Sequence, residues 1–394
     1  MHFVQNRIQI GMQTNLGRIL VALILTCPVP SAQAYNFSDR LAINGLIAGT
    51  WQCQNVSARL PSASYDDDGS FETFDNACRG AMPFQLEASF TPNEASEFFI
   101  KLGFAAGNGL NDISPWAVAP WAADLEDNVK DINGRDRDYL LAAWYRHTYS
   151  LARDSTLSAT LGILDSTDYL DNNEYANDEY TQFMNEAFVN SGSYGLPSYD
   201  WGAALEWLSG PWSIDVLGMN IGENDAGNNY NFWGIETGYH TNTRLGTGNY
   251  RVILVGTSSA FPNPGDTKQE SVLGWGLSFD QELNTVIAAF LRVTWQQSDA
   301  AVEYKALYSG GLNFDGSGWG RAADNIGLGY AWYEGGNTDI DNSRVFEGYY
   351  RLGFNDYLGL TADIQYMKDH RTEVSPAQDN PAGWVFGLRA TAEF

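Results

Sequence analysis

Apolar residues recur at every second position over many segments of about ten residues, and the C-terminal segment shows this alternation best. Every second residue from Trp384 to Phe394 is apolar or alanine, whereas the residues between them are valine, glycine, arginine, threonine and glutamate. A period of two is that of a β-strand, in which successive side chains point to opposite faces. The same pattern recurs at 155–164, 322–333 and 357–368. The chain is therefore predicted to be all-β.

About sixteen such segments occur, and an even number is typical of bacterial outer-membrane barrels. The predicted strands are 40–51, 83–90, 96–106, 137–150, 155–164, 199–208, 211–221, 231–241, 248–258, 270–280, 285–296, 303–313, 322–333, 343–354, 357–368 and 383–394. Sixteen antiparallel strands that close into a barrel leave an aqueous channel, whereas eight are filled by side chains. We therefore predict a transmembrane antiparallel β-barrel.

The connections between the predicted strands alternate in length where they are easiest to compare. The long connections are 52–82, 107–136 and 165–198, and the short ones are 91–95, 151–154 and 209–210. Outer-membrane barrels have long extracellular loops and short periplasmic turns. This alternation predicts that both termini of the barrel are periplasmic.

The first 34 residues have the features of a secretory signal peptide. Arg7 and Arg18 are their only charged residues, an apolar run follows at 19–25, and Ala32-Gln33-Ala34 is a small-x-small cleavage pattern. We predict cleavage before Tyr35, which leaves residues 35–394 as a single barrel domain.

Two alternatives concern this N-terminal segment. Met12 is a second possible start and gives a signal of more usual length. A lipoprotein would use Cys27 as its lipid anchor, but Thr26 stands where such signals normally have glycine, alanine or serine. A signal peptide that is cleaved before Tyr35 remains the better interpretation.

The composition agrees with a barrel in a membrane. Aromatic residues make up 14% of the chain and charged residues only 18%, and there are 40 glycines. Aromatic residues form girdles at the two membrane interfaces, and glycine suits tight turns and crowded walls. The polar faces of the strands carry mainly glycine, serine, threonine and asparagine, which suits a water-filled lumen.

Two cysteines, Cys53 and Cys78, remain after the signal peptide. In an exported chain such a pair usually forms a disulfide, and two free thiols are the alternative. We predict that the disulfide lies in the first external loop. No histidine lies nearby to complete a metal site.

The chain offers little for catalysis, because its mature part has only His147, His240 and His370. His147 could face lipid, where a barrel hydrolase would need a serine and an orienting partner beside it. Tyr145 and Tyr149 flank it, so an aromatic girdle residue is the better interpretation. No metal-binding spacing and no nucleotide motif occurs. The chain is therefore predicted to be no enzyme, with no cofactor, metal or nucleic-acid partner.

Alternation assigns seven basic and eight acidic residues to the lumen. The basic residues are Lys101, Arg146, Arg251, Arg292, Lys305, Arg351 and Arg389, and the acidic ones are Glu87, Glu206, Asp215, Glu236, Glu303, Glu347, Asp363 and Glu393. The net charge is −26, so the excess acid is expected in the loops. A balanced lumen gives no strong ion preference and offers polyhydroxy solutes both donors and acceptors. Alternatively, the paired charges only neutralise each other.

The connection 165–198 combines seven carboxylates with no lysine or arginine. The carboxylates are Asp165, Asp168, Asp171, Glu174, Asp178, Glu179 and Glu186. Tyr169, Tyr175, Tyr180, Phe183 and Phe188 make it too apolar for a freely solvated loop. We predict that it folds into the barrel and constricts the pore, with Asp168, Asp171, Glu174, Asp178 and Glu179 as constriction residues. A surface loop, or one that binds divalent cations, is the alternative.

Several stretches resemble the carbohydrate-selective porin family OprB. They are Leu161–Asp165, Tyr169–Asn173, Ala176–Phe183, Tyr308–Leu312, Trp319–Arg321, Asp324–Tyr330, Glu347–Arg351 and Asp363–Met367. The resemblance covers roughly residues 140–394, and the first loop with its cysteines is not expected in every member. It implies a sixteen-stranded barrel with inward-folded loops and passive, sugar-favouring diffusion.

These observations together predict a porin for small sugars in the outer membrane of a Gram-negative bacterium. Its other expected partners are membrane lipid, lipopolysaccharide and the barrel-assembly machinery, which recognises a terminal aromatic such as Phe394. A general diffusion porin with mild cation preference is one alternative. A structural or adhesive barrel without a transport role is another.

Overall fold

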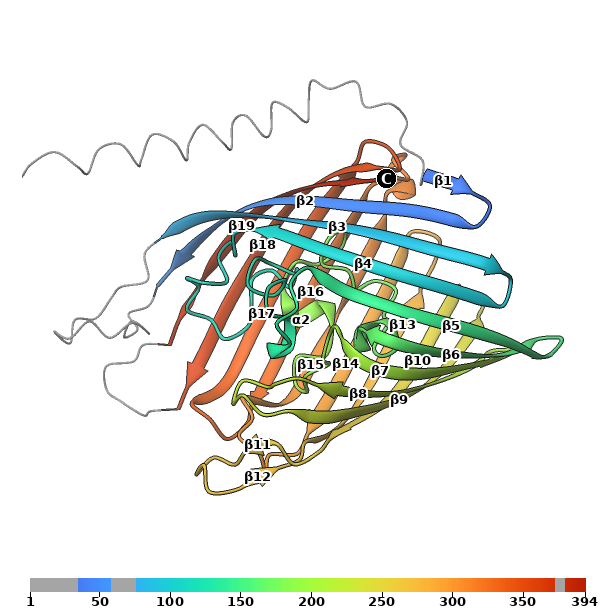
Figure 1. The fold of residues 1–394 in the computed structure, drawn as a ribbon. Coiled ribbons are helices and arrows are strands. Elements are labelled where there is room, and N and C mark those ends of the chain that lie inside the picture. The colour runs from blue at the N-terminus through green and yellow to red at the C-terminus, as the bar shows by residue number, and fades with distance from the viewer. Residues whose placement is uncertain (1–34, 58–75, 373–379) are drawn as a thin grey trace, which may run out of the picture.

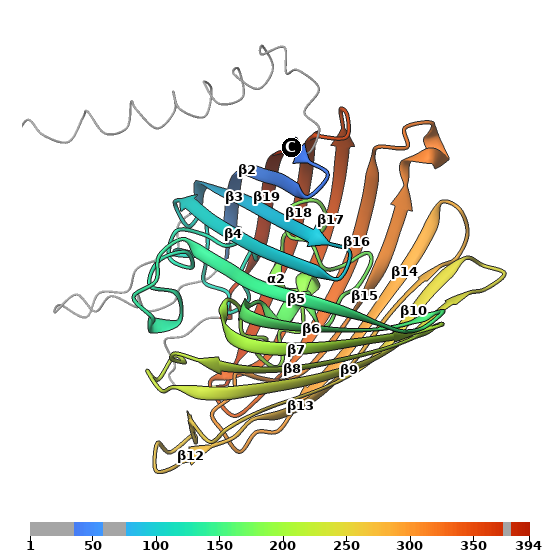
Figure 2. The ribbon, with the colours of Figure 1, turned by 45° about the vertical axis from the view of Figure 1, so that its right-hand side comes forward.

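The computed structural model describes residues 35–57, 76–372 and 380–394, and sixteen of its strands close into one barrel (Figures 1 and 2). They are β2 (Leu41–Val56), β3 (Ala77–Asn93), β4 (Ser96–Ala106), β5 (Leu140–Ala152), β6 (Ser155–Leu164), β7 (Asp200–Ser209), β8 (Trp212–Ile221), β9 (Tyr230–Asn242), β10 (Thr247–Thr257), β13 (Leu273–Glu282), β14 (Ile287–Gln296), β15 (Tyr304–Asp315), β16 (Asn325–Gly335), β17 (Ile340–Gly353), β18 (Leu358–Arg371) and β19 (Ala382–Glu393). Each strand pairs antiparallel with the next, and β19 pairs with β2. The predicted all-β barrel and its strand count are confirmed. The predicted signal peptide lies outside the described residues.

The remaining elements are short. β1 (Tyr35–Ser38) pairs with the start of β2, and β11 (Phe261–Pro262) pairs with β12 (Gln269–Glu270). The helical turns are Ile132–Gly134, Ser166–Asp168, α2 (Glu186–Val189) and Gly316–Trp319. None of the helices in the described part of the chain is long and apolar enough to cross a membrane.

The first and last described residues, Tyr35 and Phe394, lie at the end of the barrel that carries the short turns. The backbone N–H of Gly45 donates to the carbonyl of Phe394 at 3.0 Å, so the last residue is joined to β2, the first strand of the barrel wall. The long connections 107–139 and 165–199 leave from the opposite end (Figure 1). We refer to these two ends as the turn end and the loop end.

The strands alternate between an exposed apolar face and a buried or polar face. Leu161, Trp201, Leu205 and Val252 are among the large apolar residues that remain about half exposed or more on the outer wall. A soluble protein would not leave so many of them uncovered, whereas lipid covers them in a membrane. The outer wall therefore has the surface of a membrane-spanning barrel.

Aromatic rings gather on the outer wall near the turn end, as a membrane interface requires. Phe98 lies 4.8 Å from Tyr145 and His147 lies 4.5 Å from Tyr149, between ring centroids. Among the described residues, His147 hydrogen-bonds only to Ser96 and Tyr145, at 3.3 and 3.0 Å. No carboxylate orients this histidine, so its surroundings are those of an aromatic girdle.

The first two strands of the barrel extend further towards the loop end than the sequence pattern predicts. Cys53 in β2 and Cys78 in β3 face each other in the ladder, with 4.0 Å between their Cα atoms, and the structure joins them in a disulfide. The disulfide therefore lies across two paired strands rather than in the loop between them. The prediction missed this because the alternation becomes polar beyond Trp51, where the strands continue above the apolar band.

Both long connections fold into the barrel, although the sequence pattern singled out only the second. Leu110, Trp116 and Val118 of the first pack in one core with Phe183 and Phe188 of the second. The same core includes wall residues of β14 to β19, such as Phe290, Tyr333, Tyr349 and Val385. We call residues 107–139 and 165–199 together the loop shelf. It lies inside the ring of strands (Figure 2).

Glycines of the wall leave space in which side chains of the loop shelf pack. A Cβ atom on Gly234 would lie 2.4 Å from Leu170, and one on Gly329 would lie 2.7 Å from Phe188. Gly276 leaves room for the hydroxyl of Tyr194 in the same way, at 2.5 Å. The small lumen-facing residues therefore let the shelf pack directly against the backbone of the wall.

Candidate functional site

Hydrogen bonds between main-chain groups make the loop shelf a single unit. The N–H of Ala122 donates to the carbonyl of Met184 at 2.9 Å, and the N–H of Glu186 donates to the carbonyl of Ala119 at 3.2 Å. The indole of Trp121 donates to the carbonyl of Glu179 at 2.9 Å. These bonds join one loop to the other across the lumen.

Two fully buried arginines of the wall hold the shelf in place. The Nε of Arg292 lies 2.9 Å from the carboxylate of Asp171, and its other nitrogens donate to the carbonyls of Ala176 and Phe188 at 2.8 and 3.2 Å. Arg389 donates to the carbonyls of Glu179 and Gln182 at 2.6 and 2.8 Å. Both predicted lumen residues thus face inward, but the shelf covers them.

Acidic residues of the wall also bind the main chain of the shelf. Glu347 accepts hydrogen bonds from the N–H groups of Met184 and Asn185 at 2.6 and 3.0 Å. Glu236 accepts one from the N–H of Asp171 at 2.7 Å. An irregular segment inside a barrel must satisfy its backbone groups, and charged side chains form strong hydrogen bonds with them.

Of the seven carboxylates in the second loop, only Asp171 forms a salt bridge with the wall. The structure instead uses wall charges to bind backbone groups of the shelf. Alternation identified the inward-facing charges but could not show that their partners are peptide groups.

Four further predicted lumen residues form ion pairs along the wall. Arg251 lies 2.6 Å from Asp280 and 3.7 Å from Glu236. Arg146 lies 3.0 Å from Glu206, with its guanidinium over the ring of Trp144. The bases are thereby neutralised along the wall.

Three more of the predicted lumen residues, Asp363, Arg351 and Glu303, lie in different surroundings. Asp363 is buried beside Gln365, whose amide donates to it at 3.0 Å. Arg351 lies on the lumen face of β17 near Gly359, and Glu303 precedes β15 and lines a small cavity beside Glu186.

Lys305 does not line the lumen. Its Nζ lies 2.8 Å from Glu334, which is on the same face of β16 as the exposed Leu328 and Tyr330. A register shift between Tyr304 and Ala306 interrupts the alternation at this point. A bulge moves the residues beyond it to the opposite face, so alternation counted from β15 placed Lys305 on the wrong side.

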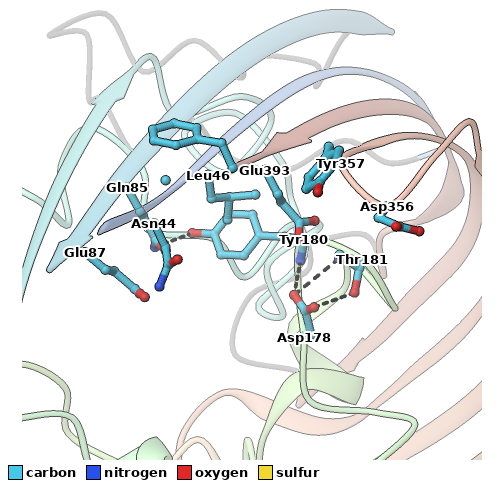
Figure 3. Close-up of a pocket in the computed structure, with 12 residues that line it drawn as sticks. Asn44, Leu46, Gln85, Glu87, Asp178, Tyr180, Thr181, Asp356, Tyr357 and Glu393 are labelled. Atoms are coloured by element: carbon cyan, nitrogen blue, oxygen red, sulfur yellow. Dashed lines mark hydrogen bonds between the residues drawn. The ribbon is translucent and has the colours of Figure 1, made fainter. Parts of the chain in front are cut away.

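Two cavities lie on opposite sides of the loop shelf. The loop-side cavity has a volume of about 520 Å³ and is lined by shelf residues together with Gln85 and Lys101 of the wall. The turn-side cavity has a volume of about 430 Å³ and reaches Glu393 and Phe394 at the end of the chain (Figure 3). Both cavities lie against the lumen face of β3, at Gln85.

The two cavities share three lining residues, Gln85, Asp178 and Tyr180, which we call the septum. The amide of Gln85 donates to the Tyr180 hydroxyl at 3.0 Å (Figure 3). It also donates to Asp124 at 3.3 Å. Asp178 accepts hydrogen bonds from the N–H groups of Tyr180 and Thr181 at 2.8 and 3.2 Å. A solute that crosses the barrel along these cavities must pass the septum.

Sequence reasoning missed several residues of this site. Gln85 has the lumen parity of β3 and was passed over only because it is uncharged. Asp124 and Tyr199, whose hydroxyl donates to Asp124 at 2.6 Å, come from parts of the shelf that no periodic pattern marks. Of the predicted constriction residues, Asp168, Asp178 and Glu179 line the loop-side cavity. Asp171 is buried, and Glu174 is exposed outside both cavities.

Crowding in the shelf raises the pKa of its carboxyl groups. Burial, and then the neighbouring Asp165, raise the pKa of Asp168 to about 7. Burial, and then Asp178, raise the pKa of Glu179 to about 8. The pKa of Asp124 is also raised by burial, and Lys101 opposes this shift. The loop-side cavity therefore changes its charge near neutral pH.

Metal binding is not indicated at these carboxylates. Within residues 35–57, 76–372 and 380–394, no group of three histidine, cysteine or acidic side chains is arranged to hold a metal ion.

Comparisons with known proteins identify the architecture. The sequence model of a family described as "Carbohydrate-selective porin, OprB family" matches residues 122–394. An uncharacterized protein of Aquifex aeolicus is 31% identical over 305 residues, covering 77% of this chain and 80% of that protein. The porin AaxA of Chlamydia pneumoniae is 24% identical over 313 residues, covering 72% of this chain and 67% of that porin.

Solved structures share the fold at low sequence identity. The high-pH structure of OprB from Pseudomonas putida matches with a TM-score of 0.68 at 16% identity, covering 90% of this chain and 94% of that one. The outer-membrane channel DcaP of Acinetobacter baumannii matches with a TM-score of 0.54 at 10% identity, covering 90% and 97%.

Proposed function

The chain belongs to the carbohydrate-selective porin family OprB, and we propose that it lets small sugars diffuse passively across the outer membrane of a Gram-negative bacterium. The family and the barrel establish a porin of the outer membrane, a channel rather than an enzyme. The preference for sugars is the proposal. One observation carries it: the two cavities that meet at a polar septum.

The septum carries hydrogen-bonding groups and an aromatic ring, both of which can contact a polyhydroxy solute. Gln85 and Asp178 provide amide and carboxylate groups, and Tyr180 provides a hydroxyl and a ring. Sugars exchange hydrogen bonds with water for hydrogen bonds with such groups, and their apolar faces can stack on an aromatic ring. Thr181 and Asn44 continue the row of polar groups into the turn-side cavity (Figure 3). A neutral solute can therefore remain hydrogen-bonded throughout its passage.

The buried charges of the wall have a second role in this proposal. Arg292, Arg389 and Glu347 hold the shelf rather than the solute, because their hydrogen-bonding groups are occupied by it. Their contribution to selectivity is to fix the position of the septum. Lys101 and Glu87, 3.6 Å apart, line the open lumen and are proposed to contact the solute directly.

Liposome swelling with the mature protein tests this function. Monosaccharides should enter faster than disaccharides and faster than neutral amino acids of similar size. A Tyr180→Ala variant, which removes the ring and the hydroxyl from the septum, should reduce the difference between sugars and amino acids. Equal rates for sugars and amino acids in the unmodified protein would leave a porin without sugar preference.

We propose that residues 1–34 are removed on export and that both termini of the barrel are periplasmic. We also propose that the barrel-assembly machinery recognises Phe394. N-terminal sequencing of protein purified from outer membranes tests the first of these, and a start at Tyr35 is expected.

A further inference from the structure

The charge of the open lumen differs from that of the whole lumen. Alternation gave nearly equal numbers of bases and acids, but the loop shelf covers Arg292 and Arg389 completely. Arg251 and Arg146 are paired with wall carboxylates, and Lys305 faces outward. Among the described residues that line either cavity, Lys101 is the only base.

The acids that line the two cavities outnumber this base. Those of the loop-side cavity are Asp124, Asp165, Asp168, Asp178, Glu179 and Glu186, and those of the turn-side cavity are Glu87, Asp178, Asp356 and Glu393. Asp178 belongs to both sets, so nine different carboxyl groups line the cavities with one lysine, while Arg351 on the lumen face of β17 lines neither cavity and acts on Glu393 alone among these acids. That lysine lies 3.6 Å from Glu87, which offsets its charge. An excess of acid therefore extends along the path on both sides of the septum.

Two of these carboxyl groups are not engaged by other described residues. Within the described part of the chain, the side chains of Asp168 and Glu179 form no ion pair and no hydrogen bond to another residue, while both line the loop-side cavity. Their oxygens can thus accept hydrogen bonds from a passing solute. Asp165, by contrast, accepts from the N–H of Thr167 at 3.0 Å, as a cap of its own loop.

An ammonium group matches this lining. It carries a positive charge and three donors but no acceptor, so carboxylate, amide and hydroxyl oxygens can all bind it. A narrow, water-filled path with an excess of one charge concentrates ions of the opposite sign and repels those of the same sign. We propose that, among solutes other than sugars, the pore favours small organic cations that carry an ammonium group over neutral and anionic solutes of the same size. This inference rests on the proposed function as a porin and specifies a preferred substrate class for the same path.

Proteoliposome uptake of lysine, glutamine, glutamate and glucose tests the inference. The three amino acids are similar in size and carry net charges of about +1, 0 and −1 at neutral pH. At low ionic strength, initial uptake of lysine should exceed that of glutamine at least about threefold, and glutamate should be slowest. The advantage of lysine should shrink with added salt, because the Debye length falls to about 8 Å at physiological ionic strength.

Two matched double variants test whether the preference for lysine comes from carboxyl groups that line the path. Asp168→Asn with Glu179→Gln removes two carboxyl groups at almost constant size and breaks no hydrogen bond to another described residue. Asp225→Asn with Asp299→Asn makes the same change at exposed positions that line neither cavity. The first variant should reduce the preference for lysine, and the reduction should be larger in mildly alkaline than in mildly acidic buffer, because the raised pKa values leave both groups partly protonated near neutral pH. The second variant should keep the preference.

The outcomes separate this inference from the proposed function. If glucose enters and lysine is no faster than glutamine, the cation preference is wrong and the porin stands. If lysine is fastest but both double variants behave alike, the preference does not come from this path and the inference also fails. If neither glucose nor any amino acid enters, the proposed function itself is wrong.

Discussion

The guanidinium of Arg292 and the carboxylate of Asp171 lie 2.9 Å apart, and both side chains are fully enclosed inside the barrel. Arg292 belongs to β14 in the wall and Asp171 to the second loop of the shelf. Their contact fixes one side of the shelf to the wall, and the carbonyls of Ala176 and Phe188 use the remaining nitrogens of the arginine. The position of the loop shelf, and with it of the septum, therefore depends on residues that line neither cavity.

Removing the charge of Arg292 should loosen the loop shelf. In an Arg292→Met variant the carboxylate of Asp171 remains buried without its partner, which typically costs about 3–5 kcal/mol. Single-channel recordings should show larger and noisier currents, while the heat-modifiable gel shift of the folded barrel persists. The double variant Arg292→Met with Asp171→Leu should be closer to the unmodified protein, because it leaves no unpaired charge. Unchanged current in the single variant would contradict the role assigned to this pair.

Deleting residues 172–188 should enlarge the pore. This segment includes septum residues Asp178 and Tyr180 and the rings of Phe183 and Phe188, which pack against the wall. Single-channel conductance should rise, and discrimination between sugars and other neutral solutes should fall. As a control, deletion of the exposed residues 225–227 at the loop end should leave both unchanged. If the deletion of 172–188 has no effect on conductance, solutes follow another path.

Ion preference should depend on pH near neutrality. The pKa values of Asp168 and Glu179 are raised to about 7 and about 8, so both groups are largely neutral below pH 6 and negative above pH 9. The charged groups that face them are Lys101, Arg146 and Glu87 of the wall, Asp124 of the first loop, and Asp165 and Asp178 of the second. The cation-to-anion permeability ratio should therefore increase as pH rises through this range.

Reversal potentials in a gradient of potassium chloride measure this ratio. The double variant Asp168→Asn with Glu179→Gln should show a smaller increase with pH than the unmodified protein. A ratio that falls as pH rises would contradict the assignment, since deprotonation of these groups can only add negative charge.

Removing the disulfide should leave the barrel folded. Cys53 and Cys78 face each other across strands that already pair by backbone hydrogen bonds, so the covalent bond constrains mainly the connection between them. A Cys53→Ser with Cys78→Ser variant should keep its heat-modifiable mobility and its sugar permeability. Thiol labelling of the unreduced, denatured protein should detect no free thiol at these two positions. Two labelled thiols would show that the disulfide does not form.

Most of the barrel could be predicted because the two faces of a strand meet different surroundings, and apolar and polar residues alternate along its sequence accordingly. Every second residue of β19 faces lipid, so Trp384, Phe386 and Leu388 had to be apolar, and the same alternation located the other strands and the inward face of Arg292 and Arg389. Where a bulge interrupted the alternation, at Tyr304 and Ala306, the assignment of Lys305 was wrong.

The pore itself was decided by the tertiary structure. No period marks residues 107–139, because an irregular loop buries side chains according to the wall that it meets rather than to its own repeat. From the sequence, Gln85, Asp124 and Tyr180 could be identified only as single polar residues. Asp124 lies 39 positions and Tyr180 lies 95 positions after Gln85. They meet because the loop shelf folds back inside the ring, and that fold depends on wall charges that bind peptide groups. Peptide groups are the same in every residue, so the sequence alone cannot show which of them a charged side chain will hold.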